Sequence, residues 1–114
     1  MKRPEQNLQI TCVRWFRYQH PDEILIHIPN GGYRTAIEAL KFKQMGVLSG
    51  VLDLLLLKKS GKYGALFIEM KSSKGKLTES QKLMIERLEM KGYKCEVASS
   101  FEEFKRIIEG YFKL

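Results

Sequence analysis

The sequence predicts a single α/β sandwich, with a mixed central sheet flanked by helices and the element order αβαββαβα. Three observations lead to this fold class: helical periodicity in four segments, short apolar runs rich in β-branched residues between them, and Gly or Pro near the boundaries. A chain of 114 residues with 44% hydrophobic content can bury one core. We therefore expect one domain that covers residues 1–114.

The first half of the chain alternates between helical and extended patterns. Residues 5–19 place apolar side chains at helical spacing, and a proline follows this run. Residues 24–28 form a short apolar run that is closed by the turn-forming segment 29–32, which predicts a strand. A second helix is predicted over residues 34–45, with Gly46 placed to cap its end.

Two neighbouring strands are predicted in the middle of the chain. Residues 50–57 are almost wholly apolar apart from Asp53, which is typical of a strand covered on both faces. A polar turn over residues 58–62 leads into a second strand over residues 63–71, so we expect an antiparallel pair. The remaining predicted elements are a helix over residues 78–91, a strand over residues 93–98 and a closing helix that begins after Ser100.

The composition indicates which class of partner and which cellular compartment to expect. The chain carries 20 Lys and Arg against 13 Asp and Glu, and its net charge of +7 favours a polyanionic partner such as nucleic acid. No stretch approaches the roughly 18 apolar residues of a membrane span, and residues 1–5 lack the apolar run of a signal peptide. We therefore expect a cytoplasmic protein without a membrane partner. Cys12 and Cys95 do not have the spacing of metal ligands. The sequence also lacks a Gly-rich phosphate-binding loop, so we expect no nucleotide cofactor.

Three charged residues stand inside the apolar strands. Asp53 interrupts the first of the paired strands, and Glu69 and Lys71 lie near the end of the second. Ionised groups in such surroundings are costly unless they are paired or coordinated. Strand alternation places Glu69 and Lys71 on one face and turns Met70 to the other, and antiparallel pairing would bring Asp53 beside them.

This pattern indicates phosphodiester hydrolysis at a metal ion. Two clustered carboxylates repel each other, and a hard divalent cation such as Mg²⁺ or Mn²⁺ relieves that repulsion better than zinc. Such a cation polarises a phosphate and lowers the pKa of water, while the ammonium of Lys71 can orient the water or stabilise the transition state. The spacing leaves an alternative open, in which Asp53 and Lys71 form a structural ion pair and Glu69 is a lone charge at the strand end.

The motifs resemble a known family. The motif residues are Gly50-Val51-Leu52-Asp53, then Ile68-Glu69-Met70-Lys71, then Gln81 on the following helix. They resemble the PD-(D/E)XK nuclease signature, and specifically the virus-type replication-repair nuclease (VRR-NUC) domain. The resemblance covers nearly the whole chain, including Glu5 and Gln9 on the first helix, and implies a restriction-endonuclease-like fold. Leu52 replaces the usual proline, which sets backbone geometry and ligates nothing.

The resemblance implies a role for each site residue. Asp53, Glu69 and the backbone carbonyl of Met70 would bind the metal, and Lys71 would be the catalytic lysine. Two further roles are implied: Glu5 would complete the acidic cluster, directly or through water, and Gln81 would orient water or substrate. Both have structural alternatives, since residues 78–81 also match a helix capping box and a first-turn acid such as Glu5 suits a helix dipole.

DNA is the expected substrate, and a homodimer the expected assembly. The predicted DNA contacts are Arg34, Lys41, Lys43, Lys74 and Lys76, although each lysine taken singly is also typical of a solvated surface. The resemblance implies structure-selective cleavage of branched DNA in phage-type replication or repair, in a bacterial or phage-infected cell. The alternatives are a catalytically inactive nucleic-acid-binding module and a subunit of a larger assembly. His27 is predicted to be a packed histidine rather than a ligand.

Overall fold

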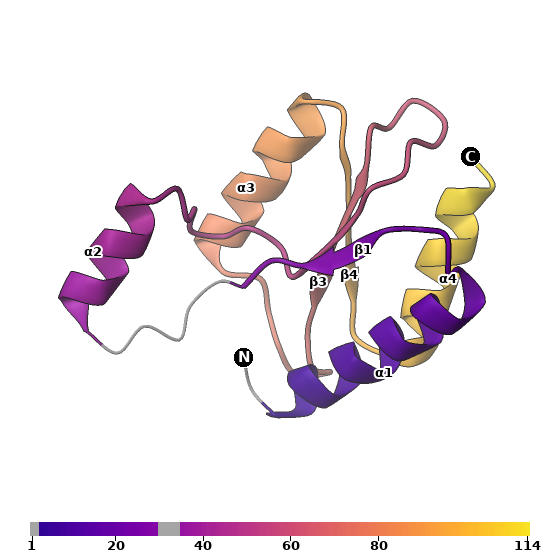
Figure 1. The fold of residues 1–114 in the computed structure, drawn as a ribbon, viewed down its shortest axis with the longest axis horizontal. Coiled ribbons are helices and arrows are strands. Elements are labelled where there is room, and N and C mark those ends of the chain that lie inside the picture. The colour runs from indigo at the N-terminus through magenta and orange to yellow at the C-terminus, as the bar shows by residue number, and fades with distance from the viewer. Residues whose placement is uncertain (1–2, 30–34) are drawn as a thin grey trace.

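A computed structural model of the protein describes residues 3–29 and 35–114, and their elements follow the predicted order. Arg34 and most of the turn predicted over residues 29–32 lie outside the described residues. The elements, shown in Figure 1, are α1 (Arg3–Gln19), β1 (Leu25–His27), α2 (Ala36–Gln44), β2 (Leu54–Leu56), β3 (Leu66–Met70), α3 (Glu79–Met90), β4 (Lys94–Ala98) and α4 (Phe101–Phe112).

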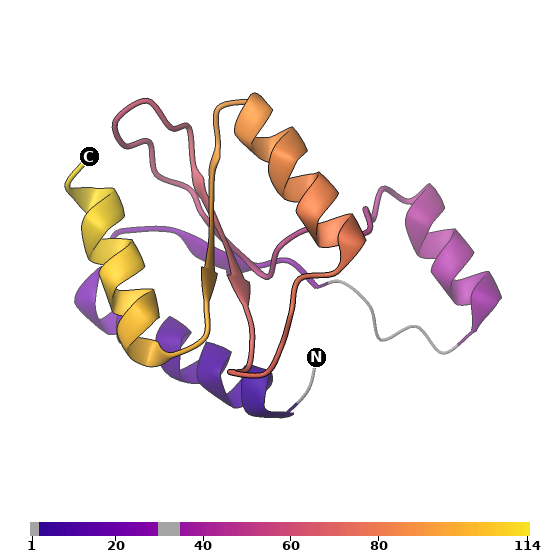
Figure 2. The same ribbon diagram turned by 180° about the vertical axis from the view of Figure 1, so that it is seen from behind.

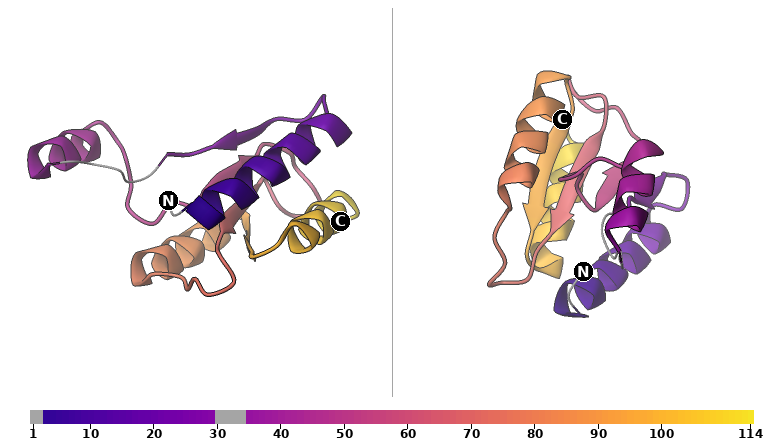
Figure 3. Two further views of the ribbon diagram at one scale, coloured as in Figure 1. Left: turned by 90° about the horizontal axis from the view of Figure 1, so that it is seen from below. Right: turned by 90° about the vertical axis from the view of Figure 1, so that its left-hand side faces the viewer.

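The four strands form one mixed sheet in the order β1-β2-β3-β4. The pairs β1–β2 and β2–β3 are antiparallel, whereas β3–β4 is parallel and is connected through α3. Viewed along the strands, α3 lies on one side of the sheet and α1 with α4 lies on the other (Figure 3). The predicted sandwich with a mixed sheet is therefore confirmed. None of the described helices is long and apolar enough to cross a lipid bilayer.

Side-chain alternation along β3 separates two hydrophobic clusters. Leu66, Ile68 and Met70 are fully buried against α1 and α4. Phe67 points to the opposite face, where it packs with Met84 of α3. Glu69 follows the same alternation as Phe67 and therefore lies on the α3 side of the sheet.

The second helix forms as predicted but covers no part of the core. Thr35 caps its first turn, and Gly46 follows its end with φ +111°. No residue of α2 is buried, and Ile37 and Leu40 are 81% and 56% exposed. Seen from the front and from behind, α2 projects from the body of the fold (Figures 1 and 2).

Gly50 fixes the segment before Asp53 against the start of α3. Its φ is +82°, a left-handed conformation that side chains disfavour. A Cβ atom at Gly50 would lie 2.3 Å from the backbone oxygen of Ser80, a contact that rigid backbone cannot accommodate. This close approach sets how the catalytic candidate Asp53 faces α3, and only glycine permits it.

Gly50→Ala is expected to destabilise the protein by more than about 2 kcal/mol, because a left-handed alanine costs roughly 1–2 kcal/mol before any clash is counted. Gly46→Ala is the matched control, since it has positive φ but nothing within 4 Å of the added methyl. Urea unfolding of both variants measures the difference. Equal losses of unfolding free energy would contradict the proposed backbone contact.

Candidate active site

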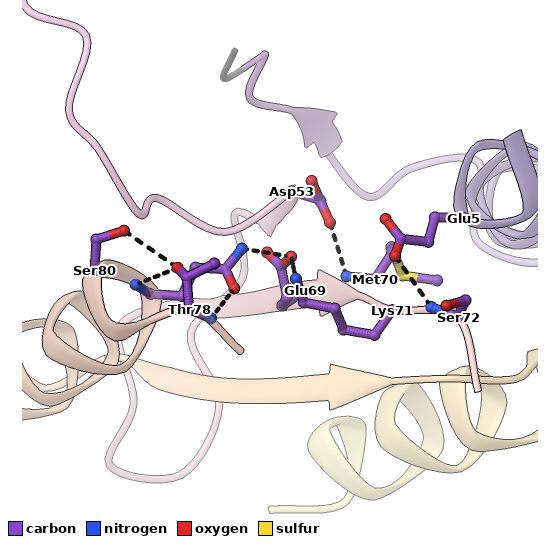
Figure 4. A network of polar contacts seen from close by, with 9 residues as sticks. Glu5, Asp53, Glu69, Met70, Lys71, Ser72, Thr78 and Ser80 are labelled. Carbon is purple, nitrogen blue, oxygen red and sulfur yellow. Dashed lines mark hydrogen bonds and ion pairs between the residues drawn. The ribbon is translucent and has the colours of Figure 1, made fainter. Parts of the chain in front are cut away.

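Sheet register brings the two strand carboxylates together. Leu54 pairs with Ile68 across the antiparallel β2–β3 pair, so one step further places Asp53 opposite Glu69 on the α3 side. Oδ2 of Asp53 accepts a hydrogen bond of 2.8 Å from the backbone N–H of Met70 (Figure 4). The side chain of Asp53 is thus held over the end of β3.

Glu69 is buried and holds its two oxygens in different environments. The residue is only 3% exposed. Its Oε2 accepts a 2.8 Å hydrogen bond from Nε2 of Gln81 and lies 3.3 Å from Nζ of Lys71 (Figure 4). Its Oε1 is buried and has no hydrogen-bond partner among the described residues. A buried oxygen without a partner costs on the order of 1–3 kcal/mol, so this atom is a natural ligand position.

The observed ion pair differs from the one considered as a structural alternative. Lys71 pairs with Glu69, and Asp53 accepts from a backbone amide instead of from Lys71. The side chain of Lys71 is 12% exposed, which leaves its ammonium at the edge of the site. The structure therefore gathers the acid pair and the lysine in one place.

Gln81 caps α3, which is one of the two roles that the sequence suggested, and it also holds Glu69. Its Oε1 accepts from the backbone N–H of Thr78 at 2.9 Å, and its own backbone N–H donates to Oγ1 of Thr78 at 3.1 Å, which completes a capping box. Its Nε2 is left to hold Glu69. One amide thus caps α3 and positions a carboxylate.

Glu5 lies on the other side of the sheet near the end of β3, and within the part of the chain that the structure describes it does not join Asp53 and Glu69 in a metal-binding group of three carboxylates. Its Oε1 accepts from the backbone N–H of Ser72 at 3.4 Å. A Cβ atom on Gly75 would lie 3.3 Å from this same oxygen and 3.3 Å from Cδ of Lys71, so the loop folds closely over both side chains. Lys74 and Lys76 are exposed on that loop.

Burial raises the pKa values of both carboxyls, and the charge of Asp53 raises that of Glu69 further. Burial, followed by the charge of Asp53, raises the pKa of Glu69 from 4.5 to about 7, against the opposing effect of Lys71. Burial also raises the pKa of Asp53, although the hydrogen bond from Met70, the charges of His27 and Lys71, and a hydrogen bond with the Glu69 side chain oppose it. The two carboxyls together therefore retain a proton near neutral pH, as expected for two neighbouring acids whose charge is not fully compensated.

The donor set fits a hard divalent cation. Glu69 Oε1 and the carboxylate of Asp53 would supply oxygen ligands, although no three His, Cys, Asp or Glu side chains converge as a metal cluster in residues 3–29 and 35–114. Mg²⁺ is commonly held by one or two carboxylates while it keeps water and substrate oxygens. Two carboxylates and a backbone carbonyl such as that of Met70 therefore suffice, whereas zinc would require more nitrogen or sulfur ligands.

The structure places His27 differently from the sequence-based prediction. His27 is exposed rather than packed, and its Nδ1 lies 2.9 Å from the backbone oxygen of Asp53 and 3.1 Å from Nε2 of Gln9. Its proximity arises because β1 pairs with β2, where His27 lies opposite Leu54. The pattern in residues 24–28 predicts a strand but does not specify its partner, so the sequence held no signal for this contact.

The predicted DNA-contacting residues divide between two regions. Lys74 and Lys76 lie on the loop beside Lys71. Lys41 and Lys43 lie on α2, which the structure places away from the carboxylates (Figure 1). These two groups would meet different parts of a nucleic acid.

The fold and the arrangement of two acids and a lysine at the ends of paired strands define a nuclease-type α/β domain. The family model of the VRR-NUC domain matches residues 1–102. A solved structure described as a VRR_NUC domain protein has a TM-score of 0.84 and 31% sequence identity, and the match covers 100% of this chain and 92% of that chain. The chain belongs to the VRR-NUC family. No curated protein matches it.

The raised pKa of Glu69 predicts that the metal-free protein loses stability as pH rises. A folded-state pKa of about 7, above the ordinary 4.5, stabilises the protein fully below 4.5, and this contribution is lost as pH rises through 7. Glu69→Gln is expected to flatten the fall in unfolding free energy between about pH 4.5 and pH 7. Urea unfolding in chelator measures it.

The control for this experiment is Glu79→Gln, which changes a side chain that is 88% exposed and should leave the pH dependence of wild type unaltered. If Glu69→Gln retains the full pH dependence of wild type, the carboxyl of residue 69 is not the group that holds the proton.

Proposed function

We propose that this nuclease domain is a Mg²⁺- or Mn²⁺-dependent endonuclease that hydrolyses DNA phosphodiester bonds, with residues 1–114 acting as one unit in the cytoplasm. The observation that carries the proposal is Glu69: it is buried, one oxygen is engaged by Lys71 and Gln81, and the other has no partner among the described residues. Membership of the VRR-NUC family supports it. A domain that only binds DNA would have no use for this buried charge.

The proposed site residues divide the work. Asp53, Glu69 and the carbonyl of Met70 would hold the cation, with Glu5 adding negative charge at the strand end. When bound, the cation supplies charge neutralisation at the scissile phosphate and a lowered pKa for water. Lys71, fixed 3.3 Å from Oε2 of Glu69, would orient the attacking water and stabilise charge on the transition state.

Hydrolysis at this site is balanced by water alone. The oxygen of water forms a bond to phosphorus as the bond between phosphorus and the departing strand breaks. One product carries the phosphate. The leaving oxygen of the other product takes up a proton and becomes a hydroxyl. Gln81 would orient water or substrate, because one N–H of its Nε2 holds Oε2 of Glu69 and the second N–H remains as a donor.

The basic residues support DNA as the substrate. Lys74 and Lys76 flank Lys71 and are suited to phosphates close to the cut. Lys41 and Lys43 on the projecting α2 are suited to a more distant part of the same DNA. We include Arg34 in this set on sequence grounds, since it lies close to α2 in the chain.

We further propose a homodimer that acts on branched DNA such as a Holliday junction, in phage-type replication or repair. The exposed apolar side chains of α2 and of the segment after it support a second copy as the partner, because Ile37 and Met45 are 81% and 71% exposed. A twofold assembly would present two catalytic centres to two strands.

Asp53→Asn is expected to lower DNA cleavage at least ~100-fold, because the cation loses one of its two charged side-chain ligands. The assay is a panel of hairpin, flap, four-way-junction, single-stranded and plasmid DNA with Mg²⁺ or Mn²⁺. Asp22→Asn is the control, since Asp22 is exposed and takes no part in the proposed site. Circular dichroism verifies that both variants fold.

Two outcomes would contradict the enzyme proposal. The first is cleavage that persists in Asp53→Asn at the wild-type rate or in excess chelator. The second is binding of the same DNA panel without cleavage under any divalent cation, which would leave a nucleic-acid-binding module.

The dimer is expected to depend on the apolar side chains of α2. Light scattering should give wild type a mass of twice 13.3 kDa and Ile37→Glu/Leu40→Glu the monomer mass, since two buried carboxylates disrupt an apolar interface. Leu83→Glu on α3, which is 59% exposed, is the control and should remain dimeric. A wild-type mass of 13.3 kDa would remove the dimer and leave the enzyme proposal standing.

A further inference from the structure

We propose that the groove between α1 and β1 is a binding track for a strand of the substrate DNA, in which Arg14 and Arg17 contact phosphates away from the cut. The inference rests on the proposed nuclease function and adds to it a substrate subsite. The groove has a volume of about 490 Å³, and neither arginine belongs to the predicted set of DNA contacts.

The groove combines an apolar surface with exposed positive charge. Val13, Ile10 and Leu25 supply its apolar lining, and Ile10 is half exposed. Arg14 and Arg17 stand on its wall, and both are exposed. Apolar surface beside guanidinium groups suits a nucleic-acid strand, whose sugars and bases are flat or apolar while its phosphates are anionic.

Both arginines are available to an anion. No carboxylate lies within ion-pair distance of Arg14 or Arg17 anywhere in the described chain, whereas Lys58, Lys71 and Lys94 each pair with a glutamate. Within residues 3–29 and 35–114, the one side-chain hydrogen bond of these arginines runs from Nη2 of Arg17 to the backbone oxygen of Leu25, at 3.4 Å. A guanidinium has five N–H donors, so this bond orients Arg17 beside β1 and leaves most donors for a phosphate.

One end of the groove lies beside the backbone of Asp53, whereas the carboxylates of Asp53 and Glu69 lie on the opposite, α3 side of the sheet. Gln9 and His27 line its inner end, their side chains lie 3.1 Å apart, and Nδ1 of His27 lies 2.9 Å from the backbone oxygen of Asp53. A strand that passes from Asp53 round the edge of the sheet would meet His27 first and the arginines afterwards. This proximity favours the substrate itself over an unrelated acidic ligand.

The spacing along α1 sets the reach of the track. Gln9, Val13 and Arg17 line the groove at intervals of four residues, and Glu5 lies about one turn before Gln9. At 1.5 Å per residue the distance from Glu5 to Arg17 is roughly 18 Å, which corresponds to on the order of five nucleotides of duplex at ~3.4 Å each. The contacted phosphates should lie about that far from the cut.

Fluorescence anisotropy with labelled junction DNA tests the track, in an Asp53→Asn background that prevents cutting. Arg14→Ala/Arg17→Ala is expected to weaken binding ~10-fold or more and to reduce the slope of log K against log salt by about 1.8, the value for two phosphate contacts. Arg87→Ala/Arg106→Ala is the matched control, because it removes equal charge from exposed positions on α3 and α4.

Single methylphosphonate linkages, which are neutral, locate the contacts. The scan neutralises one phosphate at a time on either side of the cut. About five nucleotides away, one or two positions should weaken binding in the Asp53→Asn background but have no further effect once the groove arginines are replaced. Such coupling is expected only from a direct contact and not from a general loss of charge.

The outcomes separate this inference from the nuclease proposal. If the groove pair and the control pair weaken binding equally, or if no linkage is coupled to the arginines, the track is wrong even where wild type cuts DNA. A third result would be that wild type cuts no substrate, while Arg14→Ala/Arg17→Ala alone weakens binding and is coupled to a methylphosphonate position. The nuclease proposal would then be wrong and the binding track would stand. A groove pair that changes self-association but not DNA binding assigns the surface to protein and overturns the proposal.

Discussion

The buried carboxylate of Glu69 is the constraint on which the site depends. Moving a charge of this kind out of water costs several kcal/mol unless it is fully paired. Lys71 and Gln81 both engage Oε2, and Oε1 is left without a partner among the described residues. Asp53 adds a second negative charge instead of relieving the first. The arrangement is therefore unfavourable for the metal-free protein, and the proposed cation would relieve it.

The fold assembles this constraint from distant segments by means of register. Because side chains alternate along a strand, a slip of one residue between β2 and β3 would turn Asp53 to the opposite face of the sheet. The pairing of Leu54 with Ile68 prevents that slip, since both are fully buried in the α1–α4 cluster. Gly50 adds a second fixed point by packing its backbone on Ser80 at the start of α3. The apolar core thereby determines where the polar groups meet.

Local sequence patterns predicted the features that depend on neighbouring residues alone. The element order followed from hydrophobic periodicity and turn residues, and the acidic residues were recognisable because Asp53 and Glu69 interrupt otherwise apolar runs. The features that the sequence did not predict depend on contacts between distant segments. The partner of β1 is not encoded within residues 24–28, so the exposure of His27 beside Asp53 was missed. The periodicity of α2 is that of a helix, and nothing in it indicates that the helix leaves the sheet uncovered.

Gln81 illustrates why site and scaffold are inseparable here. Capping and site roles appeared as competitors in the sequence because each seemed to require the whole side chain. An amide has an acceptor at one end and donors at the other, and the structure uses Oε1 for the N-terminus of α3 and Nε2 for Glu69. The capping bond therefore fixes the rotamer that holds the carboxylate. Because a shorter amide would not span both partners, the length of glutamine is itself part of the geometry of the site.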